Sequence, residues 1–143
     1  MQLQSSANAI ELDLMTDLQY LEMIEGISQS ITKGMGFDED RTYWIGMAIR
    51  EGVINAMLHG NRMDAAKRVR VHFGLRADSL QVIIQDQGVG FDPALLPDPL
   101  DPANLLKPSG RGLFCIKSFM DDVSFHRMPG GMEIRMLKRL ASN

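Results

Sequence analysis

Hydrophobic residues follow a helical period in the first part of the chain. They recur at spacings of three and four residues at Leu18, Leu21, Ile24, Ile27 and Ile31. Thr16 or Asp17 can cap this predicted helix, which stops near the glycines of "KGMGF" (33–37). Asp38 then caps a second helix, predicted to run through "EDRTYWIGMAIREGVINAMLHGN" to about residue 61.

After residue 61 the hydrophobic period changes from about 3.6 residues to two, which is typical of β-strands. The strands predicted along the whole chain are residues 9–14, 67–75, 79–86, 122–128 and 131–140. A long loop rich in glycine and proline follows the third strand, and a helix that opens on glycines is predicted at 110–120. This order predicts an α+β fold. It is a two-layer sandwich in which a mixed, mostly antiparallel sheet carries its helices on one face.

Composition narrows the class of protein. The chain has 143 residues, 45% of them hydrophobic and 23% charged, which predicts one globular domain over 1–143. A net charge of −3 gives no electrostatic reason to expect direct contact with nucleic acid or an anionic membrane. The N-terminal stretch lacks the pattern of a signal peptide, and no apolar run is long enough to span a bilayer, so a cytoplasmic location is expected.

Cysteine and methionine say little about the function of the chain. Cys115 is the single cysteine, which excludes an internal disulfide and a cysteine-cluster metal site, and its position in a predicted helix favours core packing. The eleven methionines can supply an adaptable interaction surface, but core packing is the favoured interpretation. His72 and His126 lie on predicted strands and are expected to be structural or exposed.

A stripe of polar residues interrupts the second predicted helix. At about 100° per residue, Glu51, Asn55, His59 and Arg62 fall within roughly 80° of arc. The neutral oxygen of Asn55 suits a hard cation such as Mg²⁺, and Glu51 beside it can accept a proton from an attacking hydroxyl or water. The competing interpretation is the ordinary solvent-facing edge of an amphipathic helix.

The stretch "QDQGVGFDP" (85–93) follows a predicted strand directly. Asp86 ends the strand, and Gly88 and Gly90 free the backbone for close approach to a flat or anionic group. A dinucleotide-binding fingerprint is excluded because no helix follows and the third glycine is missing, and a Walker A motif is excluded because no Gly-Lys-Ser/Thr is present. Two interpretations remain: Asp86 is a hydrogen-bond acceptor that recognises a nucleobase, or the stretch is a tight turn that binds no ligand.

A third stretch, "SGRGLFCIKSF" (109–119), places Gly110 and Gly112 at the start of a predicted helix. Unpaired amides and the positive end of the helix dipole make such a start an anion site, and Arg111 adds a movable charge. The alternative is a glycine-rich helix entry without a ligand.

Together and in this order, the three stretches resemble the nucleotide-binding boxes of the gyrase, histidine kinase and MutL (GHKL) ATPase superfamily. Glu51-x-x-x-Asn55 resembles its N box, Asp86-x-Gly88-x-Gly90 its first glycine box, and Gly110-x-Gly112 its second. Within it, "EGVINAMLHGN", "DQGVGFDP" and "GRGLFCIKSFMDDV" are similar to the signature stretches of bacterial anti-sigma factor serine/threonine kinases. The resemblance covers about residues 9–139 and implies the ATP-binding fold of this superfamily.

The resemblance also implies roles for individual residues. Glu51 would act as general base on a serine hydroxyl, Asn55 would hold Mg²⁺, and Asp86 would accept a hydrogen bond from the adenine amino group. The segment 91–109 would form a lid over ATP. The residues implied in nucleotide binding are Asn55, His59, Asp86, Gly88, Gly90, Lys107, Gly110, Arg111, Gly112 and Leu113.

The implied function is a kinase that binds Mg²⁺-ATP, phosphorylates an anti-anti-sigma (STAS-type) partner and sequesters a sigma factor, most often as a homodimer. One departure is Met132, which stands where the family usually carries a threonine that helps to bind adenine. Two alternatives remain open: a non-catalytic, ATP-gated switch that binds a partner, and an ATPase that passes phosphate to water.

Overall fold

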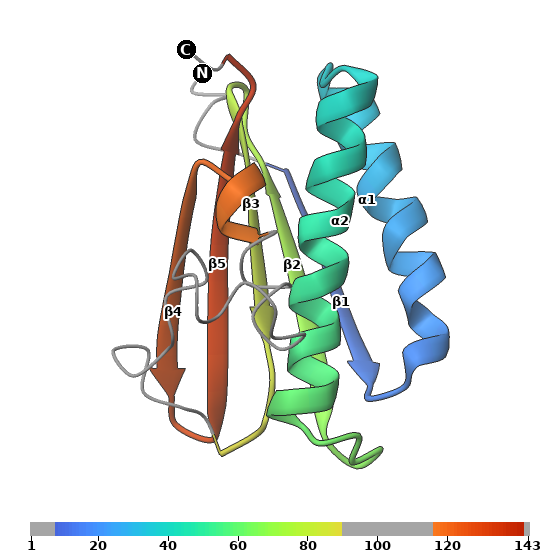
Figure 1. Cartoon of the computed structure of the whole chain (residues 1–143), viewed down its shortest axis with the longest axis vertical. Helices are drawn as coiled ribbons and strands as arrows, with labels where there is room; N and C mark the ends of the chain where they lie inside the picture. Colours follow the sequence, from blue (N-terminus) through green and yellow to red (C-terminus); the bar gives the residue numbers. More distant parts are fainter. Residues whose placement is uncertain (1–7, 90–115, 142–143) are drawn as a thin grey trace, which may run out of the picture.

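The computed structural model describes residues 8–89 and 116–141. Figure 1 shows a twisted sheet with two long helices side by side over it. The sheet has five strands in the order β1-β2-β3-β5-β4. Their bounds are β1 (Asn8–Met15), β2 (Arg68–Leu75), β3 (Ser79–Gln85), β4 (Asp122–Met128) and β5 (Gly131–Arg139).

Every neighbouring pair of described strands is antiparallel, so the predicted α+β sandwich is confirmed, and the parallel pairing of a mixed sheet is not found among these strands. The short turn between β2 and β3 and the "PGG" turn between β4 and β5 explain two of the pairings directly. β5 also pairs with β3, which brings residues 131–133 beside the end of β3 although they are far apart in the sequence.

The helical layer begins with a short 3-10 helix, η2 (Leu18–Tyr20), followed by α1 (Leu21–Met35). Asp17 caps η2 by accepting from the N–H of Gln19, and Gly36, with φ of 99°, ends α1. The second helix, α2 (Glu39–Asn55), is capped by Asp38, whose side chain accepts from the N–H of Arg41. These starts and stops match the sequence-based expectations.

The core lies between the helices and the inner face of the sheet. Its largest fully buried side chains include Ile24, Ile45, Ile49, Val53, Phe73 and Ile84. α2 approaches the sheet closely at Gly52, where an added Cβ would lie 2.7 Å from Cδ1 of Ile84. Because Gly52 faces the sheet, its neighbour Glu51 stays at the partly exposed side of the helix.

The end of the second helix differs from the prediction. The α-helix stops at Asn55, and residues Ala56–Gly60 form a single π-helical turn, η3. The N–H of Asn61 closes this wider turn on the carbonyl oxygen of Ala56, at 2.7 Å. Single π-helical turns are frequent at functional sites. None of the helices in 8–89 and 116–141 combines the length and hydrophobicity needed to cross a membrane.

Candidate functional site

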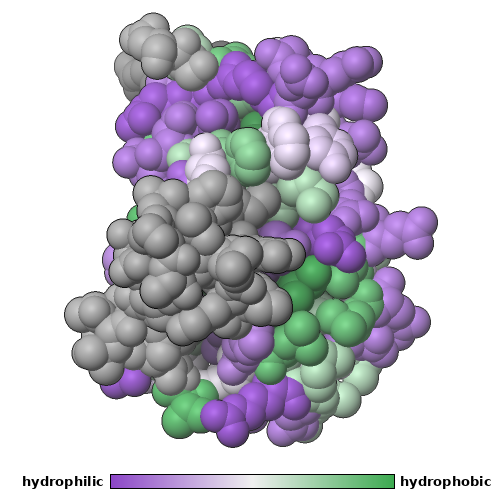
Figure 2. All heavy atoms as spheres, in the orientation of Figure 1, coloured by the Kyte–Doolittle hydropathy of each residue, from purple (hydrophilic) through white to green (hydrophobic). Residues whose placement is uncertain are grey.

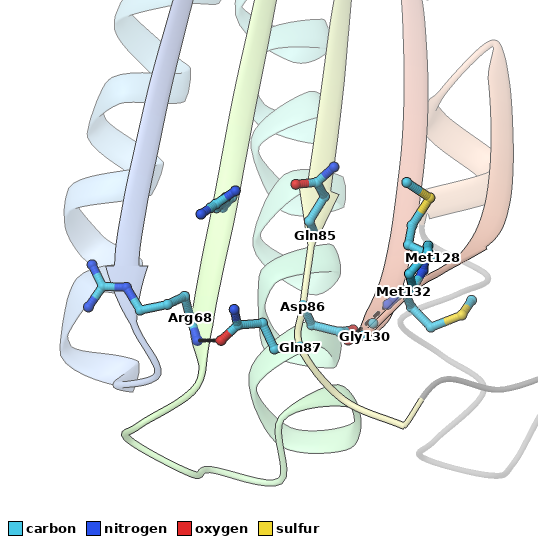
Figure 3. Close-up of a pocket in the computed structure, with 10 residues that line it drawn as sticks. Arg68, Gln85, Asp86, Gln87, Met128, Gly130 and Met132 are labelled. Carbon is cyan, nitrogen blue, oxygen red and sulfur yellow. Dashed lines mark hydrogen bonds between the residues drawn. The ribbon is translucent and has the colours of Figure 1, made fainter.

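Asp86 lies immediately after β3 and is held by the neighbouring strand. Its N–H donates to the carbonyl oxygen of Met132 at 2.9 Å, and its Oδ1 accepts from the N–H groups of Gly88 at 2.9 Å and Met132 at 3.2 Å. Figure 3 shows the Asp86 side chain turned toward the start of β5. Within the described part of the chain, Oδ2 has no hydrogen-bond partner. One carboxylate oxygen is therefore fixed, and the other can accept a bond from a ligand.

Gly60, Gly88 and Gly131 permit this arrangement, because a side chain at any of them would collide with Asp86 or with the neighbouring backbone. An added Cβ at Gly60 would lie 2.2 Å from Oδ2 of Asp86, and one at Gly131 would lie 1.9 Å from its carbonyl oxygen. At Gly88 it would lie 2.0 Å from the carbonyl oxygen of Gly60. The close approach expected for Gly88 is thus, in the first place, an approach to another part of the same chain.

The environment of Asp86 changes its acidity. Burial raises the pKa of this carboxyl above its ordinary value of 3.8, and the N–H groups of Gly88 and Met132 and the charge of Lys67 act in the opposite direction. Net, the folded protein disfavours the charged form of Asp86 relative to water. Carboxyl groups with a shifted pKa are common at functional sites.

The pKa shift predicts a gain in stability for Asp86→Asn. The folded state binds a proton at Asp86 at a higher pH than the unfolded chain, so the wild type loses stability as the pH rises from 3.8 through the raised pKa. The amide variant removes this cost and keeps an oxygen for the two backbone N–H groups. Urea unfolding at several pH values should show the variant at least as stable as the wild type at pH 7. A clearly less stable variant would mean that Asp86 mainly holds the fold together.

Glu51 and Asn55 lie one turn apart near the end of α2, and both are half-buried. Oε1 of Glu51 is 3.8 Å from Nη1 of Arg50, whose Nε forms a closer ion pair with Glu25 at 2.7 Å. The side-chain amide of Asn55 makes no hydrogen bond to any described residue. The amide of Asn55 is therefore available to a ligand, and the long pair with Arg50 is the one ion pair of Glu51 among the described residues.

A magnesium ion fits Asn55 only as a weakly held ion. Among the described residues, no group of three or more His, Cys, Asp or Glu side chains is placed to hold a metal. Mg²⁺ keeps most of its waters and is commonly held by one or two protein oxygens together with phosphate oxygens. The donor set agrees with an ion that arrives with a nucleotide.

Two members of the predicted polar stripe, Glu51 and Asn55, lie on the regular part of α2, and the other two lie beyond it. His59 lies on the π-helical turn and is exposed, and Arg62 lies past the helix with φ of 52°. The angle of 100° per residue that predicted the stripe does not hold across a π-helical turn, so the part of the stripe formed by these two residues stays a prediction. The predicted site residues Gly90, Lys107, Gly110, Arg111, Gly112 and Leu113, together with Cys115, lie outside the described residues.

The structure adds residues that the sequence analysis left out of the site. Gly60 and Gly131 contact Asp86, and Asn61 is fully buried beside it. Met132, whose side chain is also buried, serves Asp86 through its backbone, which does not depend on the side chain that replaces the family threonine. The pairing of β3 with β5 brings the "PGG" stretch to Asp86, and the contacts of Gly60 with Asp86 and Gly88 bring the "HGN" stretch there.

A depression of about 270 Å³ lies at the same end of the sheet, on the side opposite the helices (Figure 3). Its lining includes Arg68, Gln85, Asp86, Gln87, Met128 and Met132. The free oxygen of Asp86 faces Gly60, on the helical side, so this depression is separate from the wall formed by α2 and η3. The two strand histidines lie in polar pairs on the sheet: His72 with Glu11 at 3.0 Å, and His126 with Ser124 at 2.8 Å.

Comparison with known proteins agrees with this geometry. Residues 14–138 match the model of the histidine kinase-like ATPase domain. The chain belongs to this family. The match includes the N-box residues on α2 and Asp86 after β3, so the resemblance to GHKL ATPases is confirmed, and with it an ATP-binding domain.

Curated relatives of this ATPase-domain chain carry the name serine-protein kinase RsbW. The protein of Oceanobacillus iheyensis is 27% identical over 96% of this chain and 90% of its own length. The protein of Bacillus subtilis (strain 168) is 26% identical over 96% of this chain and 89% of its own length. The protein of Bacillus cereus (strain G9842) is 29% identical over 90% of this chain and 83% of its own length.

Solved structures share the fold of this histidine kinase-like domain. The RsbU and RsbW domains of Rv1364c from Mycobacterium tuberculosis match with a TM-score of 0.67 and 15% identity, over 93% of this chain and 32% of that one. The histidine kinase domain of the blue-light activated histidine kinase EL346 from Erythrobacter litoralis matches with a TM-score of 0.53 and 18% identity. This match covers 86% of this chain and 60% of that one. At these identities the similarity concerns the fold alone.

Proposed function

We propose that this chain is an ATP-dependent serine/threonine protein kinase of the anti-sigma factor type. The observation that carries the catalytic part is the position of Glu51, half-buried and one helical turn before Asn55, whose side-chain amide bonds to no residue in the described part of the chain. The names of the curated relatives support the same activity. The nucleotide would lie between the helical layer and the segment after β3.

In this proposal each residue has one task. Oδ2 of Asp86 would accept a hydrogen bond from the adenine amino group, and the side-chain oxygen of Asn55 would hold Mg²⁺. Glu51 takes the proton of the serine hydroxyl while the serine oxygen forms a bond to the γ-phosphorus. The bond from that phosphorus to the β–γ bridging oxygen breaks at the same time, and ADP leaves. Bound Mg²⁺ neutralises phosphate charge. His59, Gly88 and the glycine-box residues outside the described part complete the proposed nucleotide site.

The proposed partner is an anti-anti-sigma (STAS-type) protein that bears the acceptor serine, and a sigma factor is the proposed target of sequestration. Figure 2 shows hydrophobic side chains gathered over the lower part of the helical layer. The exposed hydrophobic residues of η2, α1 and η3 include Leu18, Met23 and Leu58. Exposed patches of this kind support a protein-binding surface. A homodimer in the cytoplasm, without direct contact to nucleic acid or membrane, completes the proposal.

Incubation with γ-labelled ATP, Mg²⁺ and a candidate anti-anti-sigma protein tests the proposal. Label on a serine or threonine of the partner is the expected result. Tight binding of the partner without any label would favour the ATP-gated switch, and free phosphate released without partner would favour an ATPase. Absence of ATP binding in calorimetry would contradict all three functions.

A further inference from the structure

The side-chain hydrogen bonds of Asn61 join three separate segments. Its side chain is completely buried. Nδ2 donates to Oγ1 of Thr16 at 2.8 Å and to the carbonyl oxygen of Arg68 at 3.0 Å, and Oδ1 accepts from the N–H of Gln87 at 2.7 Å. A buried amide with every group paired fixes the relative position of the segments that it joins.

Gln87 closes a triangle with Asn61 and Arg68. Its own side-chain Oε1 accepts from the N–H of Arg68 at 2.6 Å, which Figure 3 marks with a dashed line. The start of β2 is thus bonded to Gln87 directly and, through Asn61, a second time. The exit from β3 cannot turn without breaking one of these bonds.

The triangle acts on the peptide group between Asp86 and Gln87. On one side the N–H of this peptide donates to Asn61, and on the other its carbonyl oxygen packs against Gly131, where an added Cβ would lie 1.9 Å away. The preceding N–H, that of Asp86, donates to Met132. With the peptide clamped on both sides, the backbone that carries the Asp86 side chain is fixed, and the bonds of Oδ1 to the N–H groups of Gly88 and Met132 then orient the carboxylate.

We propose that Asn61 is a positioning residue that gives the site its preference for adenine over 6-oxopurines, acting through Gln87 on Asp86. The inference rests on the proposed contact between Asp86 and the adenine amino group. A carboxylate accepts from an amino group and repels the carbonyl oxygen of a 6-oxopurine, so discrimination depends on where its free oxygen lies. Loss of the triangle would let this oxygen move.

Calorimetric titration with ADP and with inosine diphosphate tests the inference in wild type, Asn61→Ala, Asp86→Asn and Thr32→Val. Wild type should prefer ADP by about tenfold or more. Asn61→Ala should weaken ADP binding by about tenfold and inosine diphosphate binding far less, so that the ratio of the two dissociation constants approaches one. Thr32, fully buried and bonded to the carbonyl oxygen of Ser28, is the matched control, which should lower the melting temperature and leave the ratio unchanged.

The outcomes separate two failures. If wild type binds both nucleotides equally, the adenine contact of Asp86 is wrong, and the inference falls with it. If Asp86→Asn loses the preference while Asn61→Ala keeps it, only the role of Asn61 is overturned. If Asn61→Ala does not fold, Gln87→Ala decides, because its exposed side chain carries the bond to Arg68; an unchanged ratio in that variant overturns the inference.

Discussion

Glu51→Gln is expected to slow phosphate transfer to the partner by about 10²–10⁴-fold, the range typical of a lost general base. The glutamine keeps the size of the side chain and cannot take the hydroxyl proton. Nucleotide affinity should change by less than about twofold, since Glu51 acts on the acceptor and not on ATP. Transfer is measured with labelled ATP and partner, and affinity by calorimetry with ADP.

Glu25→Gln is the matched control for this variant. Glu25 is a neighbouring glutamate on α1, and it forms the closer ion pair with Arg50. Its loss removes that ion pair without touching the proposed base, so transfer should stay close to the wild-type rate. Transfer by Glu51→Gln at a rate near that of the wild type would show that Glu51 is only a residue of the helix surface and would favour the ATP-gated switch.

The second large effect is expected for Gly88→Ala. The added Cβ would lie 2.0 Å from the carbonyl oxygen of Gly60 and 2.9 Å from its Cα, so two backbones must move apart. Overpacking of this kind costs about 3 kcal/mol, which corresponds to a fall of roughly 6–12 °C in melting temperature for a domain of this size. Because Gly60 also packs against Asp86, ADP affinity should fall by about tenfold or more.

Gly26→Ala provides the comparison for the glycine experiment. Gly26 lies within α1, and nothing lies within 4 Å of an added Cβ. Alanine is favoured over glycine in a helix by about 1 kcal/mol, so this variant should be as stable as the wild type or more stable. A Gly88→Ala protein that melts and binds ADP like Gly26→Ala would contradict the close contact between residues 60 and 88.

Elements that depend on local patterns could be predicted from the sequence. The caps at Asp17 and Asp38, the strand alternation and the turn of "PGG" all act within a few residues, and the structure confirms them. The N box was recognisable because Glu51 and Asn55 lie on one regular stretch of helix. Asp86 was recognisable because it directly follows a strand and precedes glycine.

What could not be predicted depends on contacts between distant segments. Asn61, whose N–H closes the π-helical turn, also bonds through its side chain to Thr16, Arg68 and Gln87, and no periodicity reveals these contacts. His59 was placed by a regular helical angle that ends one turn earlier. Gly88 was interpreted as space for a ligand, whereas the space is taken by Gly60 of the same chain.

A crystal structure with Mg²⁺ and a non-hydrolysable ATP analogue tests the nucleotide site most directly. We predict the adenine amino group within hydrogen-bond distance of Oδ2 of Asp86, the Mg²⁺ on the side-chain oxygen of Asn55, and Glu51 facing the γ-phosphate across the space for a hydroxyl. A nucleotide bound in the depression on the opposite side of the sheet, or a metal held without Asn55, would contradict the account.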